Sequence, residues 1–274
     1  MNIALGRYTP YNTIIHRVDP RAKLVAVIGL LVAIFFNLSF WEYAFLMVIC
    51  ILLALIAKVK IKSIFSSLKA IWIMILVLLI INVIVIKTGE PLVTFWNFTI
   101  YGGSLIQTGK IVVRLVMMII LTTVLTASTK PLDLTYAIEW YMTPLKVIKF
   151  PAHEIAMTIS IALRFIPTLL EETQRLIKAQ ASRGVDLETG SIKEKLIGIT
   201  SLIVPLFVSS FQKAADLADA MEARGYNPGA KRTRYRTLSF GVRDVFALLF
   251  VAAVVTLTIL SVYHPEYARS IWPY

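Results

Sequence analysis

Five long apolar stretches constrain this chain more than any other feature of its sequence. The length of each is close to that of a membrane-spanning helix, which needs about 20 residues to cross the hydrocarbon core of a bilayer. Of the 274 residues, 58% are hydrophobic and only 16% are charged, whereas a typical soluble domain has about a quarter charged. We therefore predict an all-α, polytopic helical membrane protein with about five transmembrane helices, at residues 24–40, 41–57, 68–86, 111–128 and 243–262.

The distribution of basic residues predicts the topology. Residues 1–23 and 58–69 hold four Lys/Arg each, the turn at 37–42 holds none, and 129–242 holds fifteen. Because Lys and Arg collect in cytoplasmic loops, we expect a cytoplasmic N-terminus and an external C-terminus. This bias accounts for the net charge of +12 without a nucleic-acid partner. The polar residues near 37–42 favour a tight hairpin between the first two spans.

The residue types that commonly form catalytic or metal sites are scattered along the sequence. The single cysteine, Cys50, has no partner for an internal disulfide, and His16, His153 and His264 lie far apart. The sequence contains no H-E-x-x-H, G-x-S-x-G or G-x-x-x-x-G-K-[ST] motif. We expect no catalytic residues, no metal site, no cofactor and no nucleotide site in this chain. We also expect no cleavable signal peptide, since the first 23 residues are polar.

The segment 129–242 separates the other two parts of the chain. It is too polar to span throughout, so we predict an N-terminal membrane domain at 1–128, a domain of cytoplasmic or interfacial helices at 129–242, and a last span with its external tail at 243–274. Within the middle part we expect an amphipathic helix at 132–146, lying along the interface. Two long helices at 152–183 and 191–224 should follow. They begin apolar and end charged, with helix kinks at Pro167 and Pro205. If their apolar starts enter the bilayer, the count becomes six to seven spans.

The two long helices have matching ends. The first closes with Ser182-Arg183-Gly184 and the second with Ala223-Arg224-Gly225. Glycine just past a helix end, after a basic residue, is explained by capping and by the helix dipole. Capping does not explain why the basic residue is Arg before Gly in both helices, and Arg suits the carboxylates and carbonyls of a partner. Either interpretation stays open. The same holds for five alanines in the second helix, which favour a close helix crossing or merely helix formation; they are Ala214, Ala215, Ala218, Ala220 and Ala223.

A charged motif precedes the first span. It reads His16-Arg17-Val18-Asp19-Pro20-Arg21-Ala22-Lys23. Asp19 as the N-cap and Pro20 at the first helical position should start the helix. Arg21 and Lys23 should hold its cytoplasmic end, and His16 has no evident role.

These segments together resemble the transmembrane T component of energy-coupling factor (ECF) transporters. The family's opening pattern matches His16 to Lys23, with Val18 where leucine is usual. The segment from Leu163 to Glu172 resembles the stretch before the family's first coupling arm. The paired Arg-Gly endings resemble its two coupling signatures, with Ser182 where alanine is commoner.

The resemblance implies a non-catalytic, energy-coupling subunit in a prokaryotic cell membrane. Its partners would be two cytoplasmic ABC-type ATPases, which bind the ATP, and a separate substrate-binding membrane subunit (the S component) for vitamins or metal ions. Arg183 would enter one ATPase and Arg224 the other. The residues leave open a stand-alone secondary transporter or channel, which would transport without ATP. The sequence does not identify the substrate, and it fits a shared module slightly better than a dedicated one.

Overall fold

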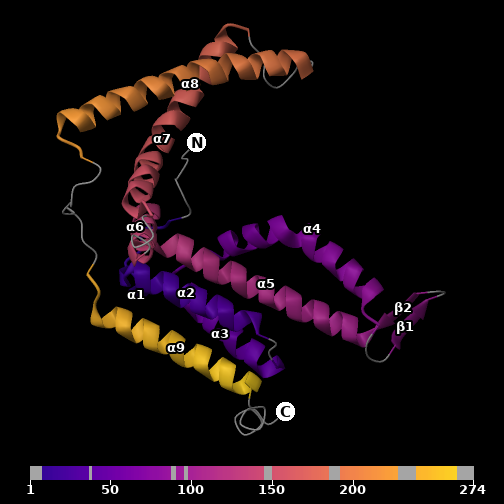
Figure 1. Ribbon diagram of the computed structural model, residues 1–274. Helices are drawn as coiled ribbons and strands as arrows, with labels where there is room; N and C mark the ends of the chain where they lie inside the picture. Colours follow the sequence, from indigo (N-terminus) through magenta and orange to yellow (C-terminus); the bar gives the residue numbers. More distant parts are fainter. Residues whose placement is uncertain are drawn as a thin grey trace. The chain divides into compact units, whose positions relative to one another are not determined.

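The computed structural model describes residues 8–36, 39–87, 91–95, 98–144, 150–184, 192–227 and 239–263. It is built almost entirely from helices (Figure 1). In chain order the elements are α1 (Ile14–Arg17), α2 (Pro20–Phe35), α3 (Phe40–Ile56), α4 (Ile61–Val85), β1 (Pro91–Phe95), β2 (Phe98–Tyr101), α5 (Gly102–Ser128), α6 (Pro131–Met142), α7 (Ala152–Ser182), α8 (Ile192–Ala223) and α9 (Val242–Tyr263).

The chain forms two compact units. One is built on Ile138–Thr237 and holds α7 and α8; the other comprises Gly6–Ala137 and Leu238–Tyr274 and holds the remaining long helices. We call them the arm unit and the membrane unit. The division at 1–128, 129–242 and 243–274 stays a prediction.

The membrane unit has one apolar core. In it α2 packs on α5 and α9, while α3 and α4 each pack on α5. Gly29 lets α2 approach α9 closely, because a Cβ there would lie 3.2 Å from Val251 Cγ1. A cation joins three of the helices: Arg114 of α5 donates to the Phe36 carbonyl at 3.2 Å and to the Tyr43 hydroxyl at 2.9 Å. The buried core side chains include Leu30, Ile34, Leu46, Ile49, Met117, Leu121 and Val254.

Within the described residues, four helices are long and apolar enough to cross a membrane, or five if the bent α4 is one span. This confirms a polytopic helical membrane protein. The set of spans differs in part from the five that the sequence predicts. Helices α5 and α9 cover the predicted spans 111–128 and 243–262, and α4, which covers 68–86, bends by 51° between Lys69 and Ile71. The other two candidates are α7 and α8.

The first two predicted spans are two separate helices, but both are short. Helix α2 has 16 residues and α3 has 17, which at 1.5 Å per residue gives about 24–26 Å against a core of about 30 Å. Helix α2 starts early, because Asp19 and Pro20 begin it, and it ends at Phe35. Residues 37 and 38, in the predicted turn, lie outside the described residues.

A small hairpin that was not predicted from the sequence precedes α5. Strands β1 and β2 pair antiparallel, with Val93 opposite Ile100 and Thr94 opposite Thr99. β-Branched and aromatic residues favour strands, and this segment is rich in both. Helix α5 then begins at Gly102, nine residues before the predicted span. Lys110 is therefore helical and not part of a loop.

Candidate coupling site

The first arm, α7, ends in a glycine cap. Arg183 is the C-cap residue, directly after the last helical residue Ser182. Gly184 follows it and has a φ of +83°. The Gly184 amide donates to the Ala181 carbonyl at 3.0 Å, one of the two bonds that define a Schellman cap. A Cβ on Gly184 would meet nothing within 4 Å, so the left-handed backbone and not lack of space favours glycine here.

The second arm, α8, ends in the same way. Gly225 has a φ of +73°. Its amide donates to the Glu222 carbonyl at 2.8 Å, and the Tyr226 amide donates to the Met221 carbonyl at 2.9 Å. These are both bonds of the Schellman cap. Capping thus explains the two glycines, as one of the two interpretations of the sequence expected.

The two arginines hold equivalent positions, one residue before the left-handed glycine. Both are exposed, and neither guanidinium group forms a hydrogen bond or ion pair with another residue that the structure describes. The caps use only backbone groups, so they leave both guanidinium groups free for another molecule. Ser182 bonds its own helix, through the Lys178 carbonyl at 3.0 Å, and Ala223 is exposed.

We expect Gly225→Ala to loosen the end of the second arm. A non-glycine residue in the left-handed region costs roughly 1–2 kcal/mol, while Gly225→Asn should cost less because Asn tolerates this region. Hydrogen exchange of the Gly225 and Tyr226 amides measures the effect. The matched control is Gly109→Ala, which lies within α5 with free space around it. Unchanged exchange in Gly225→Ala would show that the cap does not hold this end.

The arms cross through polar groups. Glu172 of α7 accepts a hydrogen bond from Ser209 at 2.5 Å and pairs with Lys213 of α8. Gln180 of α7 donates Nε2 to the Ser201 carbonyl at 3.4 Å. A crossing of the arms was one prediction from the alanines, but all five alanines are exposed. The close approach through these alanines is therefore wrong for the described arms, and the other interpretation, helix propensity, accounts for them.

Pro205 contributes to this crossing through its missing amide. Proline has no N–H, so the carbonyl four residues earlier loses its helical partner. In α8 that carbonyl belongs to Ser201, the group that Gln180 contacts. One arm thus supplies the hydrogen bond that a proline removes from the other. Pro167 and Pro205 both lie inside continuous helices, and a kink at either stays a prediction.

We expect Gln180→Leu to weaken the crossing by about 1 kcal/mol, the usual net value of one hydrogen bond. The loss should shrink when Pro205→Ala returns a helical amide to the Ser201 carbonyl. A double-mutant cycle in thermal unfolding measures this coupling. Gln174→Leu, at an exposed position on the same helix, is the matched control. Full additivity of the two substitutions would argue against the contact.

The N-terminal motif joins the starts of two helices of the membrane unit. Asp19 caps α2, since its Oδ1 accepts from the Arg21 amide at 2.8 Å. Its own amide donates to Asp244 Oδ1 at 2.7 Å, and the Gly241 amide donates to Asp244 Oδ2 at 2.6 Å. The buried carboxylate of Asp244 therefore bridges α2 to α9.

Lys23 holds the end of α5. Its Nζ donates to the Ser128 carbonyl at 3.0 Å and to the His16 carbonyl at 3.3 Å. An ammonium beside the last carbonyls of a helix is favoured by the helix dipole. Arg21, for its part, donates Nη2 to the hydroxyl of Tyr136 in α6 at 2.5 Å.

His16 has a structural role that the sequence did not show. Its Nε2 lies 3.0 Å from the Thr9 carbonyl and its Nδ1 lies 2.7 Å from Thr13 Oγ1. A neutral ring fits both, if Nε2–H donates to the carbonyl and Nδ1 accepts from the hydroxyl. Burial lowers the pKa of His16 and outweighs the Thr9 hydrogen bond, which raises it. The ring therefore fixes the segment before α1.

The fold and this site define a class of protein. It is a multi-pass helical membrane protein whose two longest helices cross and end in exposed arginines. Within the described residues no group of side chains could hold a metal ion.

Comparisons with known proteins then identify the family. Residues 11–235 match the family CbiQ, described as "Cobalt transport protein". The chain is 40% identical over 261 residues to the energy-coupling factor transporter transmembrane protein EcfT of Clostridium kluyveri, covering 95% of this chain and 97% of that protein. It is 38% identical to the EcfT of Bacillus subtilis, covering 92% and 97%. The chain belongs to the CbiQ family, as an EcfT-type T component of ECF transporters, and this confirms the resemblance read from the sequence.

Membership settles the broad function. EcfT is a non-catalytic transmembrane subunit of a transporter and binds no cofactor of its own. Three residues that complete the N-terminal network could not be predicted as part of it from the sequence motif: Asp244, Tyr136 and Ser128. Asp244 could have been noticed as an acidic residue in the first turn of a predicted span, where it suits the helix dipole. Tyr136 and the Ser128 carbonyl carried no sequence signal.

Proposed function

We propose that this protein transmits the ATP-driven motion of two cytoplasmic ABC-type ATPases to a separate substrate-binding membrane subunit, for uptake of a micronutrient such as a vitamin. The two arginines carry the proposal. Arg183 and Arg224 hold the same position at two matching helix ends, are exposed, and are not used by the caps. Arg183 docks into one ATPase and Arg224 into the other.

The contacts between the arms support a transmitting role. Glu172, Gln180, Ser201, Ser209 and Lys213 link α7 to α8. A displacement at one arm end is therefore resisted by polar contacts with the other arm. The coupling residues are Ser182, Arg183, Gly184, Ala223, Arg224 and Gly225.

The proposed arrangement places the N-terminus and both arm ends in the cytoplasm of a prokaryotic cell, with the protein spanning its plasma membrane. The excess of basic residues in 1–23, 58–69 and 129–242 supports this orientation. The chain then works as a membrane domain at 1–128, a coupling-helix domain at 129–242, and a last span at 243–274.

Co-purification and reconstitution test the proposal. The full chain, expressed with ABC-type ATPases and an S component from the same cell, should recover two ATPase subunits. Proteoliposomes of the complex should transport the micronutrient only when ATP is supplied on the side of the membrane that carries the ATPases. Uptake by the purified chain alone, without ATP, would instead establish a stand-alone secondary transporter or channel.

A further inference from the structure

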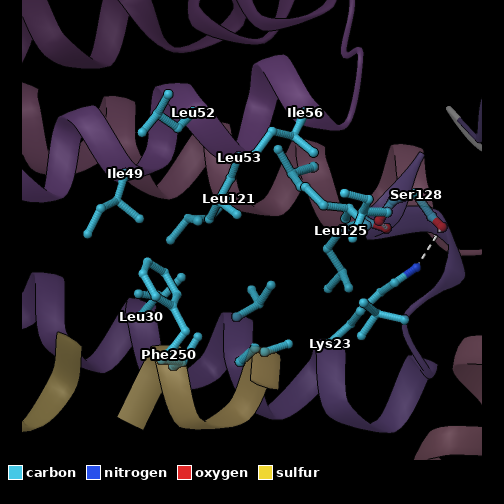
Figure 2. Close-up of a pocket in the computed structure, with 18 of the residues that line it drawn as sticks. Lys23, Leu30, Ile49, Leu52, Leu53, Ile56, Leu121, Leu125, Ser128 and Phe250 are labelled. Atoms are coloured by element: carbon cyan, nitrogen blue, oxygen red, sulfur yellow. Dashed lines mark hydrogen bonds between the residues drawn. The ribbon is translucent and has the colours of Figure 1, made fainter. Parts of the chain in front are cut away.

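A cavity of about 500 Å³ lies inside the membrane unit. Helix α9 packs on α2 and helix α3 packs on α5, and the cavity lies between these two pairs (Figure 2). Figure 2 shows Leu52, Leu53 and Ile56 on one side and Leu30 and Phe250 on the other. Its size falls within the range of about 300–1,000 Å³ for small-molecule sites.

The walls of the cavity are mostly apolar. Leu30, Leu121 and Val124 in its lining are buried. At the rim, Leu52 of α3 is 51% exposed and Phe246 of α9 is 69% exposed. Within the bilayer such a cavity is filled most favourably by hydrocarbon, because an apolar cavity does not hold water.

Charge is confined to one end. Lys23 and Arg243 are the cationic residues in the lining. The hydrogen bond from the Asp19 amide to Asp244 brings the starts of α2 and α9 together, so both cations stand at the same end. Figure 2 shows Lys23 beside Ser128 at this end, while Ile49 lies toward the other.

Arg243 has no structural duty among the described residues. Its side chain is exposed and forms no hydrogen bond or ion pair with another described residue. It lies in the first turn of α9, where a cation opposes the helix dipole. Its exposed guanidinium is available to an external anion.

We propose that this cavity binds one acyl chain of an anionic phospholipid, with the lipid phosphate at Arg243 and Lys23 behind it. The apolar interior takes the chain and the cationic end takes the headgroup. The charge at one end distinguishes this occupant from an apolar helix of a partner protein. The lipid would fill the space between α3 and α9 and so join the two pairs of helices.

Native mass spectrometry of the purified full chain tests this site, with phosphatidylglycerol as the anionic probe and the zwitterionic phosphatidylethanolamine, which has no net charge, as the comparison. Arg243→Gln should weaken phosphatidylglycerol binding about fivefold, the effect of one basic residue at a lipid surface. Lys62→Gln, which removes an exposed charge on α4, should leave it unchanged. Inorganic phosphate in excess should not displace the lipid, because the chain supplies most of the affinity.

A second variant fills the cavity. Ala247 lines it, and Ala247→Phe should abolish the binding of phosphatidylglycerol. Ala252→Phe, at an exposed position of the same helix, is the control and should leave that binding unchanged. Equal binding of both lipids, wild-type affinity in Arg243→Gln, or lipid retention in a folded Ala247→Phe protein would each overturn the proposal. Arg243→Gln lies at an exposed position and keeps the test decisive if Ala247→Phe does not fold.

Discussion

The double substitution Arg183→Ala, Arg224→Ala should leave the protein inserted and folded but unable to hold its ATPases. Truncating an arginine anchor at an interface commonly costs about 2 kcal/mol or more, which is roughly thirtyfold in affinity for each arm. Both side chains are exposed and the caps do not need them. The loss should therefore appear in ATPase recovery and in ATP-dependent uptake, with the thermal unfolding of the chain unchanged.

Each single substitution should release or uncouple one ATPase. Arg175→Ala is the matched control, since it removes an exposed arginine from the same arm, two turns before its end. Normal assembly and uptake by the double variant would remove the coupling role from these residues. A parallel loss in Arg175→Ala would attribute the effect to the general charge of the arm and not to its end.

Asp244→Ala should strongly destabilise the membrane unit. The carboxylate is 3% exposed and accepts the amides of Asp19 and Gly241. Leaving a buried donor without its acceptor costs about 1–3 kcal/mol, and this applies to the amide of Asp19, which is buried. The amide of Gly241 belongs to an exposed residue and should add less. Thermal unfolding in detergent should show a clear decrease in the midpoint, together with poorer membrane insertion.

Asp244→Asn separates charge from hydrogen bonding. It keeps one acceptor oxygen and should lose less stability than Asp244→Ala. Asp219→Ala, at an exposed position of α8, should be close to neutral. An Asp244→Ala protein as stable as the wild type would show that the link between α2 and α9 depends on apolar packing alone.

The long helices could be predicted closely because their signals are local. The sequence predicts arms at 152–183 and 191–224, and the structure has Ala152–Ser182 and Ile192–Ala223. Apolar periodicity sets the start of each arm and a left-handed glycine sets its end. The Asp19-Pro20 start of α2 was equally legible, since an N-cap acts within three residues.

The contacts between distant segments could not be predicted. Asp244 lies 225 residues from Asp19, and no local pattern reports such a pairing. The alanines of α8 misled for the same reason. Their composition permits a close crossing, but Glu172 and Gln180 of α7 contact Ser201, Ser209 and Lys213, which precede the alanines in α8. The hairpin of β1 and β2 was missed because the segment was assessed for charge and not for strand periodicity.

The proline in α8 has a consequence for the mechanics of the arms. Pro205 lies inside this helix and removes the amide that would bond to the Ser201 carbonyl. In the described part of α8, Gln180 donates to that carbonyl instead. Sliding one arm along the other by a turn would separate the Gln180 side-chain amide from the Ser201 carbonyl. Neighbouring carbonyls inside the helix are already bonded to helical amides and could not replace it. The contact therefore favours a single register between the two arms. We expect a load at either end to rotate the arms together about the crossing and not to slide one along the other.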